Sequence, residues 1–120
     1  MKNRSTLTRP DGTKLWYKNG LLQRTDGPAI EYPNGVKIWY NNGKLHRIHG
    51  PAVEWNDGTK EWYLNGRLHR INGPAVEWFD RSKAWFLDGI NYTKLNYYRE
   101  LFKRKLISKE KLGIILLLEF

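Results

Sequence analysis

Apolar and polar positions along this chain alternate in a pattern that recurs every 23 residues. The period is marked by four tryptophans and, four residues after each, a glycine: Trp16, Trp39, Trp62, Trp85 and Gly20, Gly43, Gly66, Gly89. Self-similarity at one fixed period predicts a tandem array, in which short units stack on their neighbours. Such arrays present long surfaces, so a binding role is favoured over a catalytic pocket.

Each unit is predicted to contain two turns. An apolar strand around Trp39 runs into Asn42-Gly43, and Asn-Gly is a strong hairpin signal because both central residues of a type I′ turn need positive φ. Gly50-Pro51 then predicts a corner, since proline has no N–H to give to a ladder. A further strand at 52–55 leads to a second turn that ends at Gly58.

The second turn fixes the predicted pairing of the strands. A three-residue loop places Glu54 opposite Lys60, whereas a two-residue loop would place it opposite Glu61, which is a repulsive pair. We therefore predict the three-residue loop. In the first hairpin, a two-residue loop places Tyr40 opposite Leu45. The same rule pairs the equivalent residues of the other units: Glu31 with Lys37, and Glu77 with Lys83.

This register divides the side chains between two faces of a sheet. The predicted core face is mostly apolar: Ile30, Tyr32, Ile38, Tyr40, Leu45, Val53, Trp55, Tyr63, Leu68, Val76, Trp78 and Phe86. Arg47, Glu61 and Arg70 fall on the same face, where Arg70 is predicted to pair with Glu61. The other face carries the tryptophan row among polar residues: Lys37, Lys60, Glu54, Glu77, His46 and His69.

The end of the chain follows a helical pattern instead. Thr93 and Ser108 are the predicted N-caps of two helices. Their apolar residues are Leu95, Tyr98, Leu101, Phe102 and Leu106 in the first, and Leu112, Ile115, Leu116 and Leu118 in the second. Arg81 replaces the glycine that the period requires, so the array is predicted to end in a partial fourth unit.

We predict a mainly β fold with an α-helical C-terminus. Tandem 23-residue β-hairpin repeats form an elongated antiparallel sheet or solenoid, capped by one or two C-terminal helices. The array covers residues 1–91, and a helical capping or interaction tail covers residues 92–120. The units of the array are expected at about 12–34, 35–57 and 58–80, with a partial unit at 81–91.

Composition narrows the chemistry that is open to the chain. It has no cysteine, which excludes disulfides and zinc-thiolate sites. The net charge of +9 is concentrated at the two ends and favours acidic partners or nucleic acid. The apolar run 113–118 is far shorter than the about 18 residues of a membrane span. No apolar signal segment follows Met1, so a cytoplasmic location is expected and membrane insertion is not.

Catalytic and metal chemistry are not expected. Glu31, Glu54 and Glu77 each have a predicted lysine partner, and equivalent repeats supply equal environments, whereas acid–base catalysis needs two that differ. No nucleophile motif, phosphate loop or metal-binding box is present, so we expect neither an enzyme nor a cofactor. The three histidines offer no tight metal-ligand spacing: His46, His49 and His69.

Two sets of residues are candidates for interaction. The first is the tryptophan row with its neighbours: Trp16, Trp39, Trp62, Trp85, Lys37, Lys60, His46 and His69. The row is either a hot-spot surface or a structural feature covered by the tail or by a second protomer. The second set is Lys103, Arg104 and Lys105, which suit a phosphate backbone or an anionic membrane surface, or are the solvated face of a capping helix. A homodimer through the tail is a further interpretation.

Three stretches resemble MORN-type repeats, and most closely the variant found in small bacterial and phage proteins. They are DGTKLWYKNGLLQRTDGPAIEYPNG, NGVKIWYNNGKLHRIHGPAVEWNDG and DGTKEWYLNGRLHRINGPAVEW, with the W-Y-x-N-G turn and the x-G-P-A core in common. The resemblance covers Asp11 to about Asn91 and not the tail. It implies a β-hairpin array without catalytic residues that binds another protein. It also implies a phage-encoded inhibitor or adaptor, acting on a host defence complex in the host cytoplasm.

Overall fold

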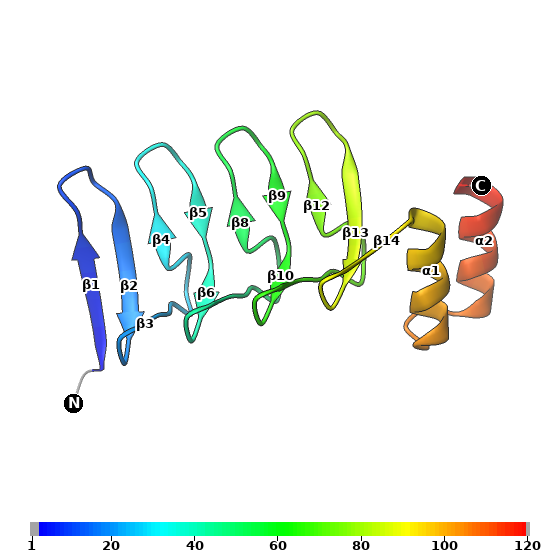
Figure 1. Ribbon diagram of the computed structural model, residues 1–120, viewed down its shortest axis with the longest axis horizontal. Coiled ribbons are helices and arrows are strands. Elements are labelled where there is room, and N and C mark those ends of the chain that lie inside the picture. The colour runs from blue at the N-terminus through cyan, green and yellow to red at the C-terminus, as the bar shows by residue number, and fades with distance from the viewer. Residues whose placement is uncertain (1–2, 120) are drawn as a thin grey trace.

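The computed structural model describes residues 3–119 as an elongated sheet followed by two helices (Figure 1). Its extents are 53, 34 and 20 Å. The predicted mainly β class with a helical C-terminus is therefore confirmed. Met1, Lys2 and Phe120, at the outer ends of the two predicted domains, lie outside the described residues.

The elements follow the repeat. The strands are β1 (Arg4–Thr8), β2 (Lys14–Lys18), β3 (Leu21–Leu22), β4 (Ile30–Glu31), β5 (Lys37–Ile38), β6 (Tyr40–Asn41), β7 (Lys44–Leu45), β8 (Val53–Glu54), β9 (Lys60–Glu61), β10 (Tyr63–Leu64), β11 (Arg67–Leu68), β12 (Val76–Glu77), β13 (Lys83–Leu87) and β14 (Ile90–Tyr92). The helices are α1 (Lys94–Lys103) and α2 (Lys109–Glu119).

One antiparallel sheet runs the length of the array, because each unit pairs with the next. Its order is β1-β2-β4-β5-β8-β9-β12-β13-β14, and β3 pairs with β2. Two short ladders, β6–β7 and β10–β11, form the hairpins of the middle units. These hairpins lie along one side of the sheet, and the longer turns lie along the other (Figure 1).

Both predicted turns are present. Asn42 has φ 51° and Gly43 has φ 77°, as a type I′ turn requires, and Tyr40 lies opposite Leu45. The second turn is the predicted three-residue loop, because Glu54 lies opposite Lys60. The equivalent pairs in the other units are also confirmed: Glu31 with Lys37, and Glu77 with Lys83.

Neighbouring units pair edge to edge, as the predicted elongated sheet requires, in a register that the sequence analysis did not specify. Glu54 lies opposite Lys37 on one side as well as Lys60 on the other, so the charges alternate across strands. The same alternation continues along the sheet: Lys14, Glu31, Lys37, Glu54, Lys60, Glu77 and Lys83. Opposite charges on directly paired residues favour this register over its alternatives.

The predicted core face is only partly correct. Ile30, Val53 and Val76 are buried in a row across the sheet, but Trp55 and Trp78 are 43% and 42% exposed. These two indoles stand where the second turns begin, and residues 3–119 contain no second layer over that end of the sheet. The remaining members of the predicted core are half-buried: Tyr32, Ile38, Tyr40, Leu45, Tyr63, Leu68 and Phe86.

Arg47 and Arg70 do not lie on the core face, and Arg70 does not pair with Glu61. The hairpin ladder ends after His46, whose N–H donates to the Trp39 carbonyl. The next residue leaves its own unit, because the Arg47 N–H donates to the Tyr63 carbonyl of the following one. The side chain is thereby released from the alternation and lies over a tryptophan on the opposite face.

At the N-terminal end of the sheet lies a strand that the sequence analysis missed. β1 pairs with β2 along its whole length, from Arg4 opposite Lys18 to Thr8 opposite Lys14. Its side chains are all exposed, so it has no buried apolar pattern to detect. It covers the edge of the first unit and becomes the outer edge of the sheet.

The two helices cap the other end. Thr93 and Ser108 are N-caps as predicted, since their hydroxyls accept from the Asn96 and Lys111 amides. The buried residues of α1 are Tyr97 and Leu101, whereas the predicted Phe102 is exposed. Two further apolar predictions are wrong in the same way, because Leu106 and Leu118 are also exposed. Leu101 is therefore buried as predicted, but it shares the buried face of the helix with Tyr97, which the sequence analysis did not include.

Candidate functional site

The tryptophan row is bound internally by a row of arginines. The guanidinium carbon of Arg47 lies 3.8 Å from the centre of the Trp39 ring. Equivalent stacks repeat in the other full units: Arg24 on Trp16 at 3.8 Å, and Arg70 on Trp62 at 3.7 Å. One face of each of these indoles is thus occupied by a cation of the same unit.

Each arginine is fixed by further bonds. The Arg47 Nη1 donates to the Pro51 carbonyl at 3.1 Å and to Glu54 at 3.0 Å. These bonds recur in the units of Arg24 and Arg70. The role that the three glutamates share in the fold is therefore to hold arginines. The sequence analysis assigned them lysine partners, which lie opposite them but make no ion pair within 4.0 Å among residues 3–119.

A glycine closes the other side of the guanidinium. A Cβ atom on Gly50 would lie 2.9 Å from the Arg47 guanidinium carbon, and Gly50 has φ 144°. Any side chain at this position would displace the arginine from its tryptophan. The glycine of the x-G-P-A core is thus required by close packing as well as by the turn.

His46 and His69 link one unit to the next. The Nδ1 atom of His46 accepts from the Asn65 amide at 3.0 Å, and His69 accepts from the Asp88 amide at 2.9 Å. In the first unit the Gln23 side-chain oxygen accepts from the Asn42 amide in the same way. What the repeat needs at this position is therefore a hydrogen-bond acceptor, which a glutamine or a neutral imidazole provides.

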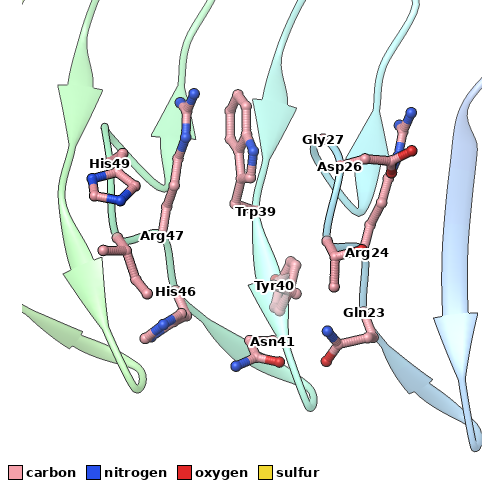
Figure 2. A pocket seen from close by; sticks show the side chains of 12 residues that line it. Gln23, Arg24, Asp26, Gly27, Trp39, Tyr40, Asn41, His46, Arg47 and His49 are labelled. Carbon is pink, nitrogen blue, oxygen red and sulfur yellow. The ribbon is translucent and has the colours of Figure 1, made fainter.

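Two grooves lie between successive loops on this side of the array. The first has a volume of about 660 Å³ and is lined by residues 23–27, 39–41 and 46–49. Figure 2 shows Trp39 between the loops that carry Arg24 and Arg47. The second groove has a volume of about 680 Å³ and is lined by residues 46–50, Trp62, Leu64 and residues 69–72.

The grooves combine apolar and polar groups. Ile48 is 71% exposed and Ile71 is 49% exposed, so the two loops that border the second groove each present an isoleucine to solvent. The imidazoles of His46 and His49 and the arginine stems complete the walls. Concave surfaces of several hundred cubic ångströms with a few polar groups are typical binding sites.

At the end of the array the corresponding position is filled by α1. The Tyr97 hydroxyl donates to the Arg70 carbonyl at 2.5 Å and accepts from the Gly73 amide at 3.2 Å. Tyr97 is fully buried and packs with Leu87 and Leu101, while Trp85 lies against this cluster. The sequence analysis missed Tyr97, whose only signal is its place four residues before Leu101.

The predicted basic cluster of the tail is divided. Arg104 docks the tail on the array, with Nη1 2.7 Å from Asp88 and Nε 2.9 Å from Glu100. The hydrogen bond from Arg104 holds the pKa of Asp88 below its usual range. Lys103 and Lys105 are exposed, and Lys105 has φ 61° just after the helix. Of the three, only Arg104 is bound within the structure as described.

The other predicted site residues lie apart from the grooves. Lys37 and Lys60 are exposed in the row of alternating charges at the middle of the sheet. Trp85 is half-buried against the tail, and Lys94 lies 5.7 Å from its ring centre, where the other units have an arginine. The structure therefore places four predicted site residues in the walls of the grooves, Trp39, His46, Trp62 and His69, and separates the two lysines from them.

A further polar site lies on the opposite face. Glu61 lies between Val53 and Val76 in the sheet, at a position where the other units have an apolar residue. Its carboxylate accepts from the Tyr63 hydroxyl at 2.9 Å and from the Trp55 indole N–H. Burial, and then the hydrogen bond and charge of Glu61, raise the pKa of Tyr63 to about 12. The Glu61 carboxylate, which departs from the repeat, is therefore paired with two hydrogen-bond donors.

Comparisons with protein-family models, with curated proteins and with solved structures found no match. Over residues 3–119, neither helix has the length and apolar character that crossing a membrane requires. The same residues hold no group of three or more histidine, aspartate or glutamate side chains placed to bind a metal ion.

Proposed function

We propose that this chain is a non-enzymatic repeat protein that binds a segment of another protein in the grooves of its array. The observation that carries the proposal is the pair of neighbouring grooves of about 660 and 680 Å³, one repeat apart. The arginines in their walls are held by stacks and hydrogen bonds that recur from unit to unit. Arginines and glutamates in recurring environments suit repeated contacts with one partner, whereas acid–base catalysis needs two groups in different environments.

The resemblance of the units to phage MORN-variant repeats supports a narrower form of the proposal. In that form the partner is a protein of a bacterial host, such as a component of a defence complex, and the chain acts as its inhibitor or adaptor. The location would then be the host cytoplasm.

The test is capture of the partner by variants that differ only in the grooves. We expect the intact chain to retain a specific protein, which the double variant Ile48→Glu and Ile71→Glu loses because charge is introduced into both apolar walls. Leu7→Glu is the matched control, since Leu7 is 50% exposed on β1, away from the grooves. Equal retention by the intact chain and the groove variant would refute the proposal.

Binding of nucleic acid is the alternative function, and the exposed Lys103 and Lys105 favour it. The stacked arginines weaken it, because one face of Trp16, Trp39 and Trp62 is not available to a base. We expect only weak binding to short DNA and RNA. Affinity that is strong at low salt and falls steeply as salt rises would instead establish the alternative.

A further inference from the structure

The docked tail shows which groups at the end of the array bind a tyrosine. Tyr97 bonds to the Arg70 carbonyl and the Gly73 amide, and it packs in the cluster that Leu87 forms beside Trp85. Moving each of these residues back by one period gives residues of the second groove: Arg47, Gly50, Leu64 and Trp62. The second groove therefore repeats the backbone acceptor, the backbone donor and the leucine of the site that binds Tyr97, and differs from it in that Arg70 stacks on one face of Trp62.

The polar groups of the second groove are open. Among residues 3–119, no hydrogen bond uses the Arg47 carbonyl or the Gly50 amide, whereas the equivalent Arg70 and Gly73 groups are both bound by Tyr97. An acceptor and a donor at this spacing match one hydroxyl that donates and accepts at once. Leu64 is half-buried and supplies the apolar floor that Leu87 gives to Tyr97.

The geometry points to a helical segment of a partner protein as the occupant of the second groove, with a tyrosine in the place of Tyr97 and a leucine four residues later in the place of Leu101. This inference rests on the proposed function and specifies the chemistry of the partner. The tyrosine hydroxyl donates to the Arg47 carbonyl and accepts from the Gly50 amide. Its ring lies against Trp62 and Leu64, and residues four apart on a helix share one face.

The first groove is a poorer site for the same segment. Asn41 replaces the apolar floor, and Thr25 stands where the second groove has Ile48. A polar amide against an aromatic ring loses the apolar burial that anchors the side chain. The two grooves therefore differ in affinity for a tyrosine, although their backbones are equivalent.

A synthetic peptide of residues 93–107 is the probe, because it carries Tyr97 and Leu101 in their own context. We expect it to shift the Gly50 amide resonance of the intact, isotope-labelled chain in a saturable titration. The peptide with Tyr97→Phe should bind about 3- to 10-fold more weakly, as the loss of one hydroxyl with two modest hydrogen bonds predicts. Saturable shifts of the Gly73 amide instead of Gly50 would overturn the inference, since the peptide would then only displace the tail.

Two variants of the chain sharpen the test. Leu64→Asn copies the residue already present at Asn41 and should weaken the peptide without unfolding the unit. Asn41→Leu should create a second site, detected as a new saturable shift of the Gly27 amide. Equal binding by both variants and the intact chain would overturn the inference. The two proposals can fail separately. If the Ile48→Glu and Ile71→Glu variant loses the captured partner but the peptide does not bind at Gly50, the inference of a partner tyrosine is refuted and the proposed function stands.

Discussion

Single positions where the repeat is broken show what the repeat requires. Arg81 stands at the end of the fourth long turn with φ 75°, where Gly58 has φ 94° in the unit before. A side chain in the left-handed region costs about 1 kcal/mol relative to glycine. The turn still forms, since the Arg81 amide donates to the Trp78 carbonyl as the Gly58 amide does to Trp55.

We expect Arg81→Gly to stabilise the fold by about 0.5–1 kcal/mol, because it relieves this strain while costing some chain entropy in the unfolded state. Gly58→Arg is the reciprocal variant and should destabilise by a similar or larger amount, since a Cβ at Gly58 meets no atom within 4 Å and only the backbone resists it. Urea unfolding measures both. A lower midpoint for Arg81→Gly would contradict the interpretation of a strained turn.

Ionisation of Tyr63 makes the stability of the array depend on pH in the alkaline range. Its pKa is raised from 10.0 to about 12 by burial and by Glu61, so the fold favours the neutral hydroxyl. The stability that this preference contributes is fully present below about pH 10 and is lost as the pH rises towards 12. Ultraviolet titration should show Tyr63 ionising late, together with Tyr40 and Tyr97, whose pKa is also raised by burial. In Glu61→Gln the pKa of Tyr63 should fall towards 10 without reaching it, because burial remains. An unchanged titration in that variant would exclude Glu61 as a cause.

At the scale of the element, the stack of arginine on tryptophan is the main cross-link between a loop and the sheet. The planar guanidinium of arginine lies on the indole and donates to two oxygens at once, and lysine has no such group. We expect Arg47→Lys to destabilise the fold by about 1–2 kcal/mol, measured as a lower urea midpoint. Lys44→Arg, on an exposed strand residue, is the control and should leave the midpoint unchanged. An unchanged midpoint in Arg47→Lys would show that the stack contributes no stability.

The strands and turns could be predicted because their signals are local. Asn42-Gly43 fixes a hairpin by its backbone preference, and Glu54 selects its register through the charge of its neighbours. The position of Arg47 could not be predicted in this way. The hairpin ladder ends at His46, and the side chain then follows contacts with the next unit, which no periodic pattern within one unit records.

The candidate site was less predictable than the fold for the same reason. The tryptophan row was found from its spacing, but its partners are residues that change face between strand and loop. Tyr97 was missed because it binds Arg70 and Gly73, more than twenty residues away in the sequence. Its neighbour Tyr98 fits the helical pattern equally well, and only the docked position of α1 distinguishes the two.

At the scale of the whole molecule, the array has two unlike ends. One end is closed by β1, whose exposed side chains and charged Arg4 suit an edge that meets water. The other end is closed by α1, which is fixed by Tyr97 within the sheet and by Arg104 on Asp88 at the surface. α2 packs against α1 and adds an outer layer whose far side has no cover among residues 3–119.

That far side is apolar, which leads to a prediction about association. Leu117 is 83% exposed, Leu118 is 77% exposed and Ile114 is 57% exposed, all on α2. Contiguous apolar surface of this kind on a helix marks a contact between proteins, and the tail of a second copy offers a matching surface. We expect sedimentation velocity to show an average mass that rises with concentration.

The variant Leu117→Lys and Leu118→Lys should abolish this rise, because charge on both surfaces of a two-fold contact is repelled and costs solvation. Leu7→Lys on β1 is the control and should associate like the intact chain. A constant monomer mass for the intact chain would contradict association through α2. Loss of association in Leu7→Lys but not in the α2 variant would place the contact at the β1 edge instead.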